Sequence, residues 1–280
     1  MASAPNAGQI EFWNSAVAQT WVTQQTRLDQ LFQTLTQVLL EHAAPRAGER
    51  AIDIGCGCGA TVLELAHRVG PAGRVLGIDI SAPMLDLARK RVADAGLSQA
   101  TLVRADMSTY GFTPQDFDLA VSRFGVMFFT NPVTAFANLH GALQLDGRLV
   151  FACFRPLSEN PWVLEPLTAA KHLLPPSAPP GPEEPGQFAF ADPDRVRRIL
   201  AEAGFHDIAF ARHDPVMKLG SAERAAELSC QIGPIARALT DAPDSLKTAV
   251  QDALVGAYRR HEGPDGVVFS GGNWIVSARV

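Results

Sequence analysis

Apolar residues follow a helical period near the start of the chain and then occur in short, regularly spaced runs. From residue 11 to 42 they recur at intervals of three and four, as in Leu28, Leu31, Leu35 and Leu39, which predicts a helix over this stretch. After residue 46, short β-branched runs alternate with stretches of helical period. The predicted strands are residues 51–54, 75–80, 101–105, 117–121 and 148–154.

This alternation predicts a mostly parallel sheet with helices on both faces. Two further predicted strands, residues 208–212 and 273–280, bracket a helical stretch at 221–262. We expect these strands to form an antiparallel pair at one edge of the sheet, with the helical stretch inserted between them as a lid. Residues 156–190 are rich in proline, which predicts a loop or short cover with a brief helix near 162–173.

Composition and charge restrict the class of partner. The chain has 280 residues, of which 47% are hydrophobic and 19% charged, so it can bury a substantial core. A net charge of −5 without a lysine or arginine cluster argues against nucleic acid. No apolar run approaches the ~20 residues of a membrane span. The first residues lack the features of a secretory signal, so we expect a cytoplasmic protein without membrane contact.

The four cysteines, at positions 56, 58, 153 and 230, lack the spacing of a zinc site. We therefore expect no metal. Cys56 and Cys58 lie within a glycine-rich turn, where their small side chains fit as fillers of a tight bend.

The most informative segment runs from Ala51 to Ala60 and reads AIDIGCGCGA. A β-branched run leads to Asp53, three glycines follow at alternate positions, and a helical pattern begins at once. A strand, a glycine-rich turn and a helix N-terminus form a common platform for nucleotide-like ligands at the carboxyl edge of a parallel sheet. Gly55, Gly57 and Ala60 also satisfy the G-x-G-x-x-A fingerprint, so an NAD-dependent oxidoreductase is one alternative.

Three carboxylates distinguish the possible ligands. Asp53 would repel an anionic pyrophosphate but suits a ligand that carries an ammonium group. Asp79 ends the second strand, where a carboxylate can accept both ribose hydroxyls. Asp106 ends the third strand, where it can accept from an exocyclic amine while Met107 packs against a purine. A ligand with a cation, a ribose and an adenine but no phosphate is S-adenosylmethionine.

These segments resemble the motifs of class I S-adenosylmethionine-dependent methyltransferases, and most of all the small-molecule enzymes of the ubiquinone/menaquinone-biosynthesis type. The matching segments are Asp53-Ile-Gly-Cys-Gly-Cys-Gly59, Gly77-Ile-Asp79-Ile-Ser81, Arg104-Ala-Asp106-Met107, Phe117-Asp-Leu-Ala-Val-Ser122 and Leu145-Asp-Gly-Arg-Leu149. The resemblance covers residues 46–155 closely and the last two strands loosely. It implies an α/β fold with a doubly wound, mostly parallel, seven-stranded Rossmann-like sheet, an antiparallel edge strand and a helical cover.

The resemblance also implies a role for each matching position. The first strand and its turn would hold the methionine part of the cofactor, the end of the second strand the ribose, the end of the third the adenine, and the backbone near Ser122 the sulfonium. The implied cofactor-binding residues are Asp53, Gly55, Cys56, Gly57, Asp79, Ile80, Met84, Ala105, Asp106, Met107 and Ser122.

The acceptor side is less defined. The resemblance implies a small-molecule acceptor, and the methylated atom could be carbon, oxygen or nitrogen. Transfer from a sulfonium depends on alignment and exclusion of water, so we name no catalytic residue. On the substrate side we expect Trp13, Arg123 and Phe124, with His172 and His213 as weaker candidates for a base. A module that binds the cofactor without turnover is a second alternative.

The predicted elements divide the chain into four segments. These are an N-terminal helical cover at residues 1–45, a cofactor-binding core at 46–155, a proline-rich cover at 156–190, and the rest of the core at 191–280 with the insertion 221–262. We expect the N-terminal helix, the proline-rich segment and the insertion to form one apolar cover over the acceptor. The oligomeric state is left open, with a homodimer as one option.

Overall fold

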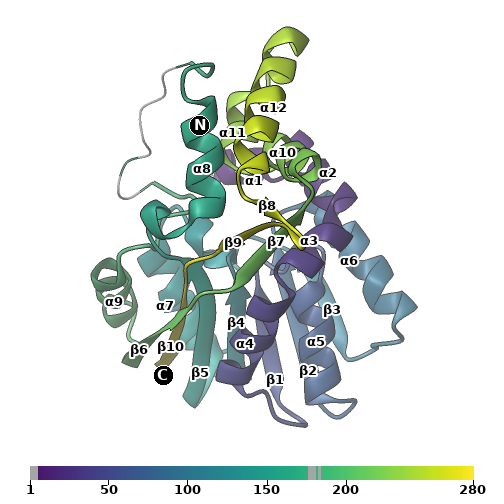
Figure 1. Ribbon diagram of the computed structural model, residues 1–280. Helices are drawn as coiled ribbons and strands as arrows, with labels where there is room; N and C mark the ends of the chain where they lie inside the picture. Colours follow the sequence, from purple (N-terminus) through teal and green to yellow (C-terminus); the bar gives the residue numbers. More distant parts are fainter. Residues whose placement is uncertain (1–5, 176–180, 182–183) are drawn as a thin grey trace.

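A seven-stranded sheet forms the centre of the computed structural model, which describes residues 6–175, 181 and 184–280 (Figure 1). The strands follow the order β3-β2-β1-β4-β5-β10-β6. They are β1 (Arg50–Ile54), β2 (Arg74–Asp79), β3 (Ala100–Arg104), β4 (Phe117–Arg123), β5 (Leu143–Phe154), β6 (His206–His213) and β10 (Asn273–Arg279).

Strand direction confirms the predicted fold class. The strands β1 to β5 pair in parallel, whereas β10 pairs antiparallel with both β5 and β6. The antiparallel pair therefore lies at one edge of the sheet, as predicted. The reversed strand is β10, one place in from the outermost strand β6.

Helices cover both faces of the sheet. They are α4 (Gln33–Ala43), α5 (Ala60–Val69), α6 (Ala82–Asp94), α7 (Pro132–Ala142) and α9 (Pro193–Glu202). Along the chain, α5 and α6 connect β1 to β2 and β2 to β3, toward one edge of the sheet. In contrast, α7 connects β4 to β5, toward the other edge. Because such crossovers are right-handed, α5 and α6 lie on the face opposite to α7. Figure 1 shows α4 and α5 in front of the strands, and α9 packs against α7 and β6.

The core lies on both sides of the central strands. Ala51, Ile52 and Ile54 of β1 are at most 1% exposed, and Leu119 and Phe151 on the neighbouring strands are fully buried. Strands that are covered on both faces carry continuous apolar runs rather than alternating ones. This explains why the central strands could be recognised in the sequence.

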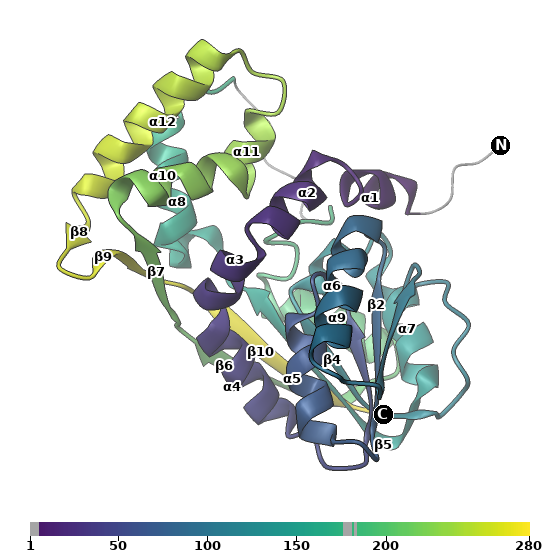
Figure 2. The same ribbon diagram turned by 90° about the vertical axis from the view of Figure 1, so that its right-hand side faces the viewer.

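A second group of elements covers the carboxyl ends of the strands (Figure 2). Its helices are α1 (Ala7–Phe12), α2 (Ala16–Thr23), α3 (Gln25–Leu31), α8 (Pro161–Ala170), α10 (Ala222–Gln231), α11 (Pro234–Ala238) and α12 (Asp244–Arg259), with the short turns η1 (Gly125–Phe128) and η2 (Leu157–Glu159). A three-stranded sheet of order β7-β9-β8 joins them, formed by β7 (Val216–Gly220), β8 (Glu262–Gly263) and β9 (Gly266–Ser270). None of the helices in the described part of the chain is both long and apolar enough to cross a bilayer.

Two local predictions were wrong. The single helix expected over residues 11–42 is a series of short helices, because Ser15 accepts a hydrogen bond from the Val17 amide and starts α2 anew. The small sheet was not predicted. Its strands β7 and β9 pair across the whole helical insertion, whereas β8 and β9 form a hairpin over the turn at 264–265.

Candidate active site

A cavity of about 1330 Å³ lies between the carboxyl ends of the central strands and the elements above them. Its wall includes the glycine turn after β1, the ends of β2, β4 and β5, and residues from the N-terminal helices, from 156–190 and from 221–262. Sites for one drug-sized ligand usually measure ~300–1,000 Å³. The cavity therefore has room for more than one small molecule.

Most of the predicted site residues meet at this cavity. Those that line it are Trp13, Gly55, Cys56, Gly57, Asp79, Ile80, Met84, Ala105, Asp106, Met107, Arg123 and Phe124. Asp53 and Ser122 do not line it, because both lie buried behind its wall.

Two glycines bring the ends of β1 and β4 together at the cavity. Gly55 has a φ of +63°, and a Cβ on it would lie 2.7 Å from the Cα of Gly125. A Cβ on Gly125 would in turn lie 2.5 Å from the carbonyl oxygen of Ile54. The turns after the two strands thus pack backbone against backbone, and neither position has room for a side chain.

Asp79 binds the glycine turn from the end of β2. Its Oδ2 accepts a hydrogen bond from the Gly57 amide at 2.8 Å, and its Oδ1 accepts one from the Ser81 amide at 2.8 Å. Burial raises the pKa of Asp79, while these backbone hydrogen bonds oppose the rise. The carboxylate therefore fixes the glycine turn against the end of β2. Each oxygen keeps a lone pair for a hydroxyl donor.

The end of β3 contributes a carboxylate and apolar side chains. Asp106 Oδ1 accepts hydrogen bonds from the amide of Ser108 at 2.9 Å and from its Oγ at 2.7 Å. Asp106 thus shapes the turn after β3 as well as lining the cavity. Met107 is buried beside it, and Met84 Cε would lie only 3.0 Å from a Cβ on Gly57. This part of the cavity is a narrow apolar slot with a carboxylate at its end.

Asp53 is 1% exposed and lies behind the glycine turn. Neither of its carboxylate oxygens has a hydrogen-bond partner among the described residues. Burial is the main reason that the pKa of Asp53 is raised to about 8, an effect that Arg123 opposes and Asp79 strengthens. A further positive charge nearby would favour the ionised form. Ser122 is equally buried, and its Oγ donates to the Ile54 carbonyl at 2.8 Å, which fixes β4 to β1.

The two cysteines of the turn are chemically inert in this environment. Burial raises the pKa of both thiols, that of Cys58 to about 12. Protonated thiols are poor nucleophiles and poor metal ligands. Within the described ranges, no three His, Cys, Asp or Glu side chains are grouped as a metal site would require.

A partly buried ionic network holds Arg123 at the cavity. Its Nη1 donates to Thr36 Oγ1 at 2.8 Å, and its Nη2 lies 3.8 Å from Asp29 Oδ1. Asp29 also accepts from Arg91 Nη2 at 2.7 Å, and Arg91 Nη1 donates to the Cys58 carbonyl at 2.6 Å. The network joins α3, α4 and α6 to the glycine turn. No sequence motif pointed to Asp29 or Arg91, because their partners are distant in the chain.

Aromatic side chains line the cavity in two clusters. The aromatic roof consists of Phe12, Trp13, Trp21 and Phe128, and the aromatic wall consists of Phe32, Phe124, Phe154, Trp162 and Phe188. In the wall, Phe124 and Phe154 stack with centroids 4.3 Å apart. Phe124 has a φ of +73°, a left-handed conformation that is unusual for a bulky residue. Sequence reasoning found Trp13 and Phe124 but missed most of the wall, whose members come from separate segments.

Asn14 attaches the aromatic roof to the end of β2. Its Nδ2 donates to the Ile80 carbonyl at 3.0 Å, and its Oδ1 accepts from the Ala82 amide at 2.9 Å. These bonds hold the segment that carries Trp13 against the connection that follows Asp79.

The histidines proposed as bases do not line the cavity. His213 ends the outermost strand β6, and burial lowers its pKa. His172 follows α8 and faces solvent. The structure therefore supports a base role for neither of these weaker candidates.

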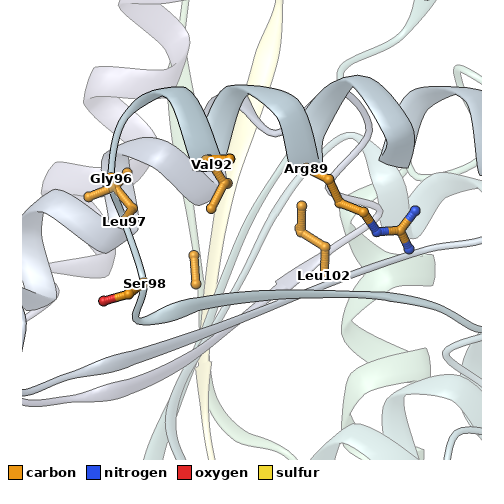
Figure 3. A pocket seen from close by; sticks show the side chains of 8 residues that line it. Arg89, Val92, Gly96, Leu97, Ser98 and Leu102 are labelled. Carbon is orange, nitrogen blue, oxygen red and sulfur yellow. The ribbon is translucent and has the colours of Figure 1, made fainter.

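A second hollow of about 480 Å³ lies between the end of α6 and β3 (Figure 3). Its lining is mostly apolar, and Arg89 is its one charged side chain. It lies away from the carboxyl ends of the strands and lacks grouped functional side chains. The larger cavity is therefore the candidate active site.

Comparison with protein families and curated proteins identifies the central part of the chain. Residues 51–147 match the family model of the methyltransferase domain. The aklanonic acid methyltransferase DauC of Streptomyces sp. strain C5 is 37% identical over 44% of this chain and 56% of its own length. The nocamycin O-methyltransferase of Saccharothrix syringae is 29% identical over 69% of this chain and 72% of its own length. The ubiquinone/menaquinone biosynthesis C-methyltransferase UbiE of Pseudomonas fluorescens is 34% identical over 40% of this chain and 44% of its own length.

The match to the first of these relatives spans little more than half of its length. Solved structures show the same fold over more of the chain. YcgJ of Bacillus subtilis has a TM-score of 0.57 at 16% identity, covering 87% of this chain and 97% of its own. Geranyl diphosphate C-methyltransferase of Streptomyces coelicolor A3(2) has a TM-score of 0.51 at 19% identity, covering 90% of this chain and 77% of its own.

Proposed function

We propose that this chain, whose residues 51–147 form a methyltransferase domain, transfers the methyl group of S-adenosylmethionine to a small-molecule acceptor. The observation that carries the proposal is the hydrogen bond from the Gly57 amide to Asp79 at the cavity. It places a carboxylate beside the glycine turn, where ribose hydroxyls can donate to it.

The residues around the glycine turn fit the cofactor in three respects. Gly55 and Gly57 line the cavity without side chains, so a ligand can approach the backbone of the turn. The apolar slot of Ile80, Met84 and Met107 suits an adenine, with Asp106 available to its amino group. Asp53 has no partner of its own and would favour a ligand ammonium through its field from behind the turn.

Arg123 completes this half of the cavity. Its guanidinium is fixed by Thr36 and Asp29 next to the glycine turn. A cation held there suits the carboxylate of the methionine part. In the sequence Arg123 was expected on the substrate side, and we now assign it to the boundary between the two ligands.

When bound, S-adenosylmethionine would supply a methyl group whose positively charged sulfur is the leaving group when an electron-rich acceptor atom attacks the methyl carbon in line. The chain's own residues contribute binding, orientation and exclusion of water. Asp79 and the glycine turn fix one ligand, while the aromatic roof and wall keep the rest of the cavity apolar. We assign no side chain as a base.

The relatives support a small-molecule acceptor, since the name of one specifies aklanonic acid and those of others quinone biosynthesis. The oxidoreductase alternative is opposed by the carboxylates Asp53 and Asp106, which suit an ammonium and an amine rather than a pyrophosphate, and by the family match. A module without turnover would bind the cofactor in the same way. We place the protein in the cytoplasm, because its four cysteines are unpaired as expected in a reducing compartment.

Replacement of Asp79 tests the proposal. We expect Asp79→Ala to lower the affinity for S-adenosylhomocysteine at least about tenfold, because a buried charged hydrogen-bond acceptor is lost. Calorimetric titration gives the affinity, and circular dichroism checks the fold. Asp86→Ala is the control, because Asp86 lies on the neighbouring helix with its side chain 74% exposed. Unchanged affinity in a folded Asp79→Ala variant would contradict the assignment.

A further inference from the structure

The cavity divides into two halves along the sheet. Asp79 and Asp106 lie at the ends of β2 and β3, on one side of the glycine turn, whereas Phe124 and Phe154 lie at the ends of β4 and β5, on the other side. If the cofactor takes the first half, as proposed above, the acceptor lies in the second half, against the aromatic wall. The side chains of this wall then determine which acceptors bind.

Trp162 contributes to this wall a ring that no other ring stacks on. It lines the cavity from α8 and is partly exposed. Its indole meets Phe154 at 5.9 Å with an interplanar angle of 44°, and Phe32 at 6.4 Å with an angle of 72°. In the described part of the chain, both of its ring neighbours thus support it at an angle and neither lies parallel to it. A flat ring of a ligand can take the stacked position.

Asn160, the residue before α8, fixes this indole. Its side chain is buried, and its Oδ1 accepts hydrogen bonds from Trp162 Nε1 at 3.1 Å and from the Gly272 amide at 2.9 Å. Its Nδ2 donates to the carbonyl oxygens of Arg155, Pro156 and Gly272. Because two donors face Oδ1 and three acceptors face Nδ2, only one orientation of the amide satisfies all of its partners. The amide therefore holds the indole N–H in one place.

The same hydrogen bond removes the polar group of the indole from the acceptor's reach. Nε1–H is the one hydrogen-bond donor of a tryptophan side chain, and here it binds Asn160, which does not line the cavity. Trp162 thus offers an acceptor a ring surface but no hydrogen bond. Contacts between aromatic rings contribute about 0.5–1.5 kcal/mol beyond the area they bury. A flat, unsaturated ring should therefore bind here better than a saturated ring of similar size.

Resting on the proposed function, we propose that Asn160 positions Trp162 so that its indole stacks on a flat, unsaturated ring of the methyl acceptor. Trp162 is then a specificity residue, and Asn160 is a positioning residue that acts through it. Both follow β5, outside residues 51–147 that match the methyltransferase domain. Selection of the acceptor is thus separate in the chain from the motifs that bind the cofactor.

The test compares 2-naphthol with decahydro-2-naphthol, which keeps the carbon skeleton and the hydroxyl but is saturated and puckered. Equilibrium dialysis of the full chain gives both dissociation constants, and saturating S-adenosylhomocysteine keeps the probes out of the cofactor half. We expect Trp162→Leu to lower the wild-type preference for 2-naphthol about threefold to tenfold, the effect of one aromatic pair. Trp274→Leu is the matched control and should keep the preference, because Trp274 lies outside the cavity against Arg155 and Arg212.

Two further variants test the positioning role. Asn160→Ala should lower the preference about twofold to fivefold in the wild-type chain, because the indole loses its hydrogen bond. In the Trp162→Leu chain it should lower the preference no further, since Asn160 acts through Trp162. A merely structural role of Asn160 would weaken both probes equally. Trp162→Phe keeps a ring but cannot donate to Asn160, so its preference should fall between those of the wild type and Trp162→Leu even if Asn160→Ala does not fold.

The outcomes separate this inference from the proposed function. If the wild-type chain does not bind S-adenosylhomocysteine, the proposed function fails and this inference fails with it. If it binds S-adenosylhomocysteine but neither probe, or if Trp162→Leu keeps the wild-type preference, the inference is overturned while the proposed function stands. A wild-type preference in both Trp162→Phe and folded Asn160→Ala would overturn the role of Asn160.

Discussion

At the scale of single residues, the carboxylates of Asp53 and Asp79 lie beside the same glycine turn but differ in their hydrogen bonds. Asp79 accepts two backbone hydrogen bonds, whereas Asp53 accepts none within the described part of the chain. Burial raises the pKa of both, that of Asp53 to about 8. A carboxylate buried without a partner destabilises the fold when it is ionised. Strongly perturbed groups of this kind are concentrated at functional sites.

The pH dependence of stability tests this account of Asp53. The unfolded chain releases the Asp53 proton near its usual value of 3.8, but the folded chain keeps it to about pH 8. The free energy of unfolding should therefore fall as pH rises through this window and level off above it. Relative to Asp53→Asn, the wild type should lose up to about 4 kcal/mol between pH 5 and pH 8, since one pKa unit is ~1.4 kcal/mol.

Urea denaturation of both variants at several pH values gives this difference, and the other titrating groups cancel because the variants share them. Parallel curves for wild type and Asp53→Asn would show that Asp53 is ionised in the folded chain at pH 5. The sequence placed Asp53 correctly before the turn. Its depth behind the cavity wall could not be predicted, because that depends on the side chains packed around it.

At the scale of elements, the N-terminal helices are parts of the cavity rather than an appendage to the sheet. Asn14 joins α1 and α2 to the β2–α6 connection, and Asp29 joins α3 to Arg91 of α6. The sequence predicted helix in this region from its apolar spacing but missed the breaks. The first break follows from the cap Ser15 and from the long-range hydrogen bonds of Asn14, which periodicity does not record.

Asn14→Ala tests the role of the aromatic roof. The variant loses the hydrogen bonds to Ile80 and Ala82, so the segment that carries Trp13 is no longer held against the connection that follows Asp79. We expect the affinity for S-adenosylhomocysteine to fall about fivefold to tenfold, in line with the loss of one or two hydrogen bonds. Gln19→Ala, on the exposed side of α2, should bind like the wild type in the same calorimetric titration. Equal affinities for Asn14→Ala and wild type would show that the roof does not contribute to cofactor binding.

At the scale of the whole molecule, the two halves of the site differ in how far sequence predicts them. The cofactor half is built from consecutive strand ends, so a motif of Asp53, Asp79 and Asp106 is sufficient to locate it. The acceptor half is assembled from the α3–α4 junction, α8 and the ends of two strands. Its members, such as Phe32, Phe154 and Trp162, share no local pattern and were found only in the structure.

Parallel titrations of the wild-type chain with S-adenosylhomocysteine and with NADH test the central claim most directly. Isothermal calorimetry should show binding of one S-adenosylhomocysteine per chain and no binding of NADH, because the family match and the carboxylates Asp53 and Asp106 favour the first ligand. Binding of NADH to the wild-type chain without binding of S-adenosylhomocysteine would contradict the account.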